Sequence, residues 1–251
     1  MSRDEYDHLR ESADEQAAAD AAATRAADPT TPEGWQARYV AEQERWLKVV
    51  EARHPGLHPV TAHIMAQDMA TAERATQAVL GGDTARHASI LVGSYARWDW
   101  ALAMLERGAY PWVEFLEDLP VLWTASDPDD TDPGSLEVWL RARRTLGSYV
   151  RDGRPLPRAT RGGTVTIYRG GATREATAKG FAWSTNPKVA RKFALGADTR
   201  VPRSHGWMVR GQVRPADVLA YLTGRDEAEV IVPASRVRDL EIKAVAKGGV
   251  E

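Results

Sequence analysis

Residues 153–163 read GRPLPRATRGG, and the character of the chain changes across this stretch. Glycine and proline interrupt regular structure, so we expect an irregular connection here. Before it, apolar side chains recur at helical spacing. After it, short runs of β-branched and aromatic residues are separated by glycine and proline. Helices followed by strands, rather than alternating with them, predict an α+β fold.

The part before the connection is expected to form several amphipathic helices. Pro32 after Thr31 suits a first helical turn, a second helix is expected from Pro59 to about Leu80, and Ser135 is expected to cap a later one. Between them, one long helix is predicted by the clearest apolar stripe in the chain, which is made of Ala88, Leu91, Tyr95, Trp98, Leu102 and Leu105.

The part after the connection is expected to form strands at 165–168, 180–184, 207–213, 229–232 and 237–245. Side chains alternate between the two faces of a strand. Trp183 should therefore point away from Ser184 and into the core, whereas Glu227 and Glu229 should lie side by side at the start of a buried strand.

Composition places the chain among ordinary globular proteins, with 251 residues, 43% hydrophobic and 27% charged. It has no cysteine, which excludes disulfides and thiolate metal sites. The sequence has no apolar run long enough to predict a membrane-spanning helix. Its N-terminus lacks the apolar core of a signal peptide. We therefore expect a cytoplasmic site of action, with delivery into another cell left open.

Two features that resemble metal sites are not expected to bind a metal. His54, His58 and His63 have loose spacing with prolines between them, and the acidic segment 126–135 lacks the glycine and the terminal glutamate of a calcium loop.

The net charge of −2 hides a basic segment. Residues 141–215 carry 17 Lys and Arg against three Asp and Glu, whereas residues 33–140 carry 17 acids against eight bases. Such a segment indicates an anionic ligand, either a small phosphate-bearing molecule or nucleic acid, or else a solvated surface.

Three short motifs in the strand half carry groups suited to nucleotide chemistry. TVTIYRGG, residues 164–171, ends a strand in Arg169, whose planar fork suits a phosphate. GFAWST, residues 180–185, delivers Ser184 and Thr185 at a strand end. EAEVIVP, residues 227–233, carries the two glutamates.

In this order the motifs resemble those of the mono-ADP-ribosyltransferases of the Arg–Ser–Glu class, which include bacterial toxins and arginine-modifying ectoenzymes. The matching pieces are the Tyr-Arg-Gly of IYRGG, the Gly-Phe-x-x-Ser-Thr of GFAWST, and Glu-x-Glu before Val-x-x-Pro. The resemblance implies a split, two-sheet core with NAD⁺ bound between the sheets, as the substrate rather than as a resident cofactor.

The resemblance also implies residue roles. Arg169 and Gly170 would bind the NAD⁺ phosphates, Ser184 would orient the catalytic glutamate, and Thr185 would support the nicotinamide-ribose site. Glu229 would be the catalytic carboxylate, with Glu227 assisting the acceptor, as in arginine-modifying members. Asn186 departs from the family's Ser-Thr-Ser at its third position.

On this basis the expected organisation is an acidic, disordered tail over 1–32, a helical region over 33–155 that partly completes the catalytic domain, and an ADP-ribosyltransferase catalytic core over 156–251. The expected activity is transfer of ADP-ribose from NAD⁺ to a macromolecule. The resemblance favours a protein arginine as the acceptor, and the basic segment leaves nucleic acid as a second one. Two alternatives remain: an NAD⁺ glycohydrolase, and a non-catalytic module that binds nucleic acid or another partner.

Overall fold

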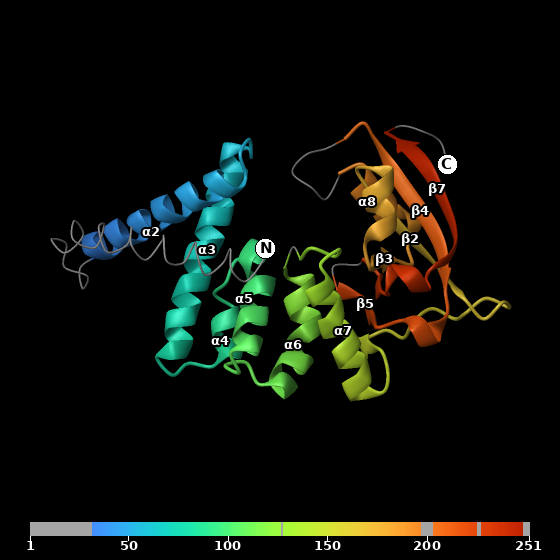
Figure 1. The fold of residues 1–251 in the computed structure, drawn as a ribbon, viewed down its shortest axis with the longest axis horizontal. Coiled ribbons are helices and arrows are strands. Elements are labelled where there is room, and N and C mark those ends of the chain that lie inside the picture. Colours follow the sequence, from blue (N-terminus) through green and yellow to red (C-terminus); the bar gives the residue numbers. More distant parts are fainter. Residues whose placement is uncertain (1–31, 127, 197–202, 225–226, 248–251) are drawn as a thin grey trace. The chain divides into compact units, whose positions relative to one another are not determined.

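A computed structural model describes residues 32–126, 128–196, 203–224 and 227–247, with only the backbone described for 32–36. The predicted acidic tail lies outside these residues, except that Pro32 begins the first helix (Figure 1). The chain divides into two compact units, one comprising 1–115 with 125–127 and the other comprising 116–124 with 128–251. The sequence predicts that the catalytic core begins after residue 155. This boundary depends on which residues take part in catalysis, and it stays a prediction.

The first unit is helical where the structure describes it. Its elements are α2 (Pro32–Arg53), α3 (Pro59–Leu80), α4 (Ala85–Ser89), α5 (Ser94–Glu106) and the beginning of α6 (Trp112–Thr124). The buried face of α3 is lined by small residues, which let neighbouring helices approach closely: Ala62, Ala66, Ala70, Ala72 and Ala75. No helix within the described ranges is long and apolar enough to cross a membrane.

The prediction of one continuous helix over 88–105 was wrong. The chain forms α4 and α5 with a break between them, and Leu91 in that break is 56% exposed. The break is fixed by Asp68, whose carboxylate accepts a 2.9 Å hydrogen bond from the backbone N–H of Tyr95 in the first turn of α5. A Cβ at Gly93 would lie 1.9 Å from the same carboxylate, so a larger residue there would displace Asp68 from this hydrogen bond.

The second unit combines the end of α6 with α7 (Pro133–Leu146) and all of the strands. The elements after α7 are β1 (Val150–Arg151), β2 (Val165–Gly171), α8 (Arg174–Lys179), β3 (Ala182–Ser184), α9 (Pro187–Ala194), β4 (His205–Val213), η1 (Pro215–Asp217), β5 (Ala220–Leu222), β6 (Glu229–Ile231), η3 (Ala234–Arg236) and β7 (Arg238–Ala246). The cap predicted at Ser135 was misplaced, because Asp132 caps α7 and accepts from the Ser135 N–H at 2.7 Å.

The α+β class is confirmed: a helical N-terminal region precedes a mixed seven-stranded sheet with the order β1-β5-β6-β3-β2-β4-β7. The β1–β5 pair is parallel, and the remaining neighbours are antiparallel. The five predicted strands all form, with shifted ends, whereas the two- and three-residue strands β1 and β5 were missed. The β2–β3 junction consists of one residue pair, Tyr168 with Ser184.

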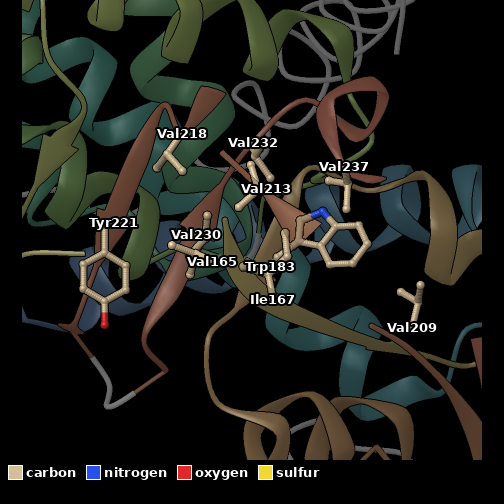
Figure 2. Close-up of a cluster of buried hydrophobic side chains, with 10 residues drawn as sticks. All are labelled: Val165, Ile167, Trp183, Val209, Val213, Val218, Tyr221, Val230, Val232 and Val237. Carbon is tan, nitrogen blue, oxygen red and sulfur yellow. The ribbon is translucent and has the colours of Figure 1, made fainter. Parts of the chain in front are cut away.

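One face of the central strands forms the core of the second unit (Figure 2). The cluster is made of Val165, Ile167, Trp183, Val209, Val213, Val218, Tyr221, Val230, Val232 and Val237. Trp183 is buried here, as alternation along its strand predicted. The β-branched majority suits both the strand backbone and close packing.

Helix α9 packs directly against the backbone of β2 and β4 at two glycines. A Cβ at Gly170 would lie 1.8 Å from the carbonyl oxygen of Ala190, and one at Gly206 would lie 2.0 Å from that of Ala194. These distances are far below van der Waals contact, so both positions require glycine. The close approach fixes α9 next to the end of β2, where Arg169 lies.

Candidate active site

The fold brings all three motifs to neighbouring strands. In the sheet, β3 lies between β2 and β6. Ser184 pairs with Glu229 on one side and with Tyr168 on the other, so the last residue of β3 and the first of β6 are directly opposite each other. Paired residues on antiparallel strands have their Cβ atoms about 4.5–5.5 Å apart. Positions separated by 45 residues in the sequence therefore form one row across the sheet.

The carboxylate of Glu229 is held by a tryptophan that the sequence analysis did not identify. The indole Nε1 of Trp123, at the end of α6, donates a hydrogen bond to Glu229 Oε1 at 3.0 Å. Trp123 is only 3% exposed and packs between Trp139, edge to face at 5.5 Å, and Phe181 at 5.6 Å. Packing on both neighbours restricts the indole, so one carboxylate oxygen has a defined position.

Ser184 fixes the backbone before Glu229 rather than the carboxylate itself. Its hydroxyl donates to the carbonyl oxygen of Glu227 at 2.5 Å and accepts from the Asn186 N–H at 3.0 Å. A serine hydroxyl has one proton, so this bond leaves none for Glu229. Trp123 is therefore a second group that orients Glu229, and the role that the resemblance implies for Ser184, orienting the catalytic glutamate, stays a prediction.

Thr185 supports the same turn. Its backbone N–H donates to the carbonyl oxygen of Ala228 at 2.9 Å. Ala228 has φ of 47°, in the left-handed region, and β6 begins only at Glu229. The alternation rule therefore does not extend back to Glu227, and the expectation that Glu227 and Glu229 lie side by side on one strand face was wrong. Glu227 lies in a turn whose backbone carbonyls, at Glu227 and Ala228, accept hydrogen bonds from Ser184 and Thr185.

Arg169 is held by an acidic partner that the sequence analysis also missed. Its guanidinium forms a two-point ion pair with Asp130, in which Nη1 contacts Oδ2 and Nη2 donates to Oδ1 at 3.0 Å, and Nη1 also donates to the Ala182 carbonyl at 2.8 Å. The two side chains are 16% and 19% exposed. The Arg169 Nε is buried without a hydrogen-bond partner among the described residues.

Two further contacts fix this ion pair. The backbone carbonyl of Asp130 accepts from the Phe181 N–H at 3.0 Å, which attaches the acidic loop to the start of β3. A Cβ at Gly180 would lie 2.2 Å from Arg169 Cζ, so the guanidinium packs on the glycine backbone. The glycine of the GFAWST motif is thus required by the position of Arg169. In the described structure Arg169 makes no direct hydrogen bond to Ser184, Glu227 or Glu229.

The acidic segment 126–135 was not expected to contribute to the site, but its Asp130 contacts Arg169. Its only sequence signal is the acidic composition, which does not identify Asp130 over its neighbours. Trp123 gave no signal, because an apolar helix ending in an aromatic residue is typical of core packing.

The sequence predicts no metal site at His54, His58 and His63 or in the acidic segment 126–135, and the structure describes these residues except 127. Within the described ranges no three His, Asp or Glu side chains group as a metal site. The His58 ring accepts from the Val60 N–H at the start of α3, so this histidine caps a helix. Part of the basic segment, 197–202 with Arg200 and Pro202, lies outside the described residues.

Comparison of the chain with protein-family models, with curated protein sequences and with solved structures finds no match. Any function must therefore be argued from the motifs and from the geometry of the site.

Proposed function

We propose that the chain cleaves NAD⁺ at the bond between nicotinamide and ribose and transfers ADP-ribose to a macromolecular acceptor. The observation that carries the proposal is the direct pairing of Ser184 with Glu229, whose carboxylate is positioned by the buried Trp123. Tyr168 is the third member of that row. The three strands thus carry the three motifs side by side, with the Ser184 hydroxyl and the Glu229 carboxylate at paired positions. Arg169 lies one position beyond this row, on the other face of β2.

The chemistry requires these groups. Departure of nicotinamide leaves positive charge on the ribose, as in the oxocarbenium-like transition state of glycoside cleavage. A fixed carboxylate next to the ribose stabilises that charge without having to reorganise during the reaction. Glu229 takes this part in the proposal, and Thr185 with Ser184 holds the turn that carries it. Glu227 would accept a proton from the attacking acceptor.

A split of the sheet into two parts belongs to the same proposal. The group β1-β5-β6-β3 is joined to the group β2-β4-β7 through the one pair Tyr168–Ser184. By contrast, β2 and β4 pair along seven residues. The narrow junction supports a core in which the two groups diverge and the nucleotide binds where they part.

Binding of the pyrophosphate to Arg169 requires a change of partner. Carboxylate and phosphate offer the guanidinium fork similar two-point geometry, and Asp130 now occupies that fork. In the proposal, the NAD⁺ pyrophosphate displaces the Asp130 carboxylate. Asp130 therefore acts as a competing anion within the chain.

Replacing Asp130 by asparagine is expected to lower the KM for NAD⁺ by about 5- to 10-fold, because a neutral amide competes less strongly for Arg169. The amide oxygen still accepts one hydrogen bond, which limits the loss of stability. Initial rates of nicotinamide release at varied NAD⁺ would measure the effect, with thermal melting as a control for folding. A raised KM would mean that Asp130 positions Arg169 rather than competing for it.

Replacing Trp123 by phenylalanine is expected to lower kcat about 10-fold with little change in KM. The ring packing is retained and the hydrogen bond to the carboxylate is lost, and a bond to a charged group contributes about 1.5–3 kcal/mol. Trp139→Phe is the matched control, because the Trp139 Nε1 is buried in the same aromatic cluster without a hydrogen-bond partner among the described residues. Equal losses in the two variants would show that only packing matters.

The test of the proposed reaction uses NAD⁺ labelled on the adenylate, incubated with the purified chain in the presence and absence of cell lysate. Label that becomes protein-bound and resists nuclease identifies a protein acceptor, and hydroxylamine lability then separates arginine from other linkages. Nicotinamide release without macromolecular label would instead assign an NAD⁺ glycohydrolase. Glu227→Gln is expected to reduce transfer more than hydrolysis, because water needs less help than a bound acceptor.

A further inference from the structure

Four arginines lie on segments that meet at one end of the sheet, away from the candidate active site. These segments are distant in sequence: Arg161 precedes β2, Arg214 follows β4, Arg236 ends η3 and Arg238 begins β7. All four are exposed. We define them as the arginine patch.

Pairing of the strands brings these segments together. Val165, the first residue of β2, pairs with Val213, the last of β4, and Gln212 pairs with Arg238. The turn that carries Arg161 is closed by the bond from the Thr160 N–H to the Thr164 carbonyl at 2.8 Å. The Thr164 hydroxyl then donates to Gln212 Oε1 at 3.0 Å, which attaches the turn to β4. The segments that carry the arginines therefore lie at the same end of three adjacent strands.

Three of the four guanidinium groups have no acidic partner. Arg214 pairs with Asp217 at 2.8 Å, whereas Arg161, Arg236 and Arg238 make no ion pair within the described residues. A second acidic residue, Asp239, follows Arg238 in the sequence, and its side chain is exposed. Unpaired arginines lose no existing ion pair when an external anion binds them.

The arginines also act on Asp217, the acidic residue that pairs with Arg214. The pKa of Asp217 is held below its usual value mainly by the hydrogen bond from Arg214, and the charges of Arg236 and Arg238 lower it further. Arg236 and Arg238 are therefore close enough to act on the same carboxylate. This effect supports the spatial grouping that strand pairing gives.

We propose that the arginine patch binds the phosphodiester backbone of a nucleic acid. The guanidinium fork suits phosphate oxygens, and a sheet spaces neighbouring strands about 4.7–4.9 Å apart. Arginines on segments at one end of three adjacent strands can contact successive phosphates of an extended chain. Val165, at this end of β2, lies about 13 Å from Arg169 along the strand, at 3.3 Å per residue. The interaction is thus separate from NAD⁺ cleavage and does not require the proposed function.

The test measures binding of fluorescein-labelled single-stranded RNA and DNA of about 20 nucleotides by anisotropy, at several salt concentrations between about 50 and 200 mM. The chain carries Glu229→Gln, so that catalysis does not disturb the reading. Three phosphate contacts predict that log Kd rises with log salt with a slope of about 2. Comparison of RNA with DNA identifies which nucleic acid is preferred.

The triple variant Arg161→Gln/Arg236→Gln/Arg238→Gln is expected to weaken binding at least 10-fold at the lowest salt and to bring the slope close to zero. The control removes three exposed lysines of α8 and α9 instead, in Lys179→Gln/Lys188→Gln/Lys192→Gln, and is expected to keep both affinity and slope. Melting curves establish that both variants are folded.

Three results would overturn the proposal. Absence of salt-dependent binding would remove the nucleic-acid partner. An equal loss in the lysine control would show that binding follows overall charge or the α9 surface. Competition by polyglutamate as effective as that by unlabelled RNA would assign the patch to acidic protein surfaces. None of these outcomes bears on whether the chain cleaves NAD⁺.

Discussion

Replacing Glu229 by glutamine is expected to lower the rate of nicotinamide release from NAD⁺ by about 10²- to 10⁴-fold. Glutamine has the same shape and keeps an oxygen that can accept the bond from Trp123, which lies 3.0 Å from Oε1 in the native chain. Only the negative charge is lost. The charge is what stabilises the positive ribose in the proposed transition state, so the effect should fall on kcat rather than on KM.

Two controls make the result specific. The melting temperature of Glu229→Gln should match that of the native chain, because the substitution leaves the strand pairing with Ser184 intact. NAD⁺ binding measured by calorimetry should also survive. A variant that binds and cleaves NAD⁺ like the native chain would remove Glu229 from the reaction and would leave the Ser184–Glu229 pair as a structural feature of the sheet.

Replacing Gly170 by alanine is expected to destabilise the second unit by about 2–3 kcal/mol or more. The added Cβ would lie 1.8 Å from the Ala190 carbonyl oxygen and 2.6 Å from the Ala194 nitrogen. Both are backbone atoms of α9, so no side chain can rotate away and the helix must move. For a unit of this size the change corresponds to a fall in Tm of roughly 5–10 °C.

The same substitution at Gly162 is a matched control. A Cβ there would meet its nearest atom, the Thr160 hydroxyl oxygen, at 3.7 Å, which is ordinary van der Waals contact. Gly162→Ala should therefore change stability by less than about 0.5 kcal/mol. Similar melting temperatures for the two variants would contradict the close packing of α9 on β2. Loss of activity in Gly170→Ala with full stability would instead favour the direct role in NAD⁺ binding that the resemblance implies.

Alternation along strands was the most reliable guide from the sequence. It placed Trp183 in the core, because β3 is paired with a neighbouring strand on each side. It failed for Glu227, because Ala228 adopts a left-handed conformation that no local pattern announces. The period-of-two rule holds only where the backbone is extended.

Contacts between distant segments set the limit for the rest. The helical stripe from Ala88 to Leu105 is continuous in the sequence, but Asp68 interrupts it from another helix by occupying the space beside Gly93. Arg169 was identified from its position at a strand end, whereas Asp130, its partner 39 residues earlier, was not. Periodicity describes one element at a time, so the partners that orient Arg169 and Glu229 became visible only in the folded chain.

The most direct test of NAD⁺ cleavage is to measure nicotinamide release by the purified native chain and by the Glu229→Gln variant, with and without lysate. We expect the native chain to release nicotinamide faster than a blank without protein, and Glu229→Gln to release it at least 100-fold more slowly than the native chain. Equal and background-level release by both proteins under all conditions, with no NAD⁺ binding by calorimetry, would contradict the proposal that the chain cleaves NAD⁺.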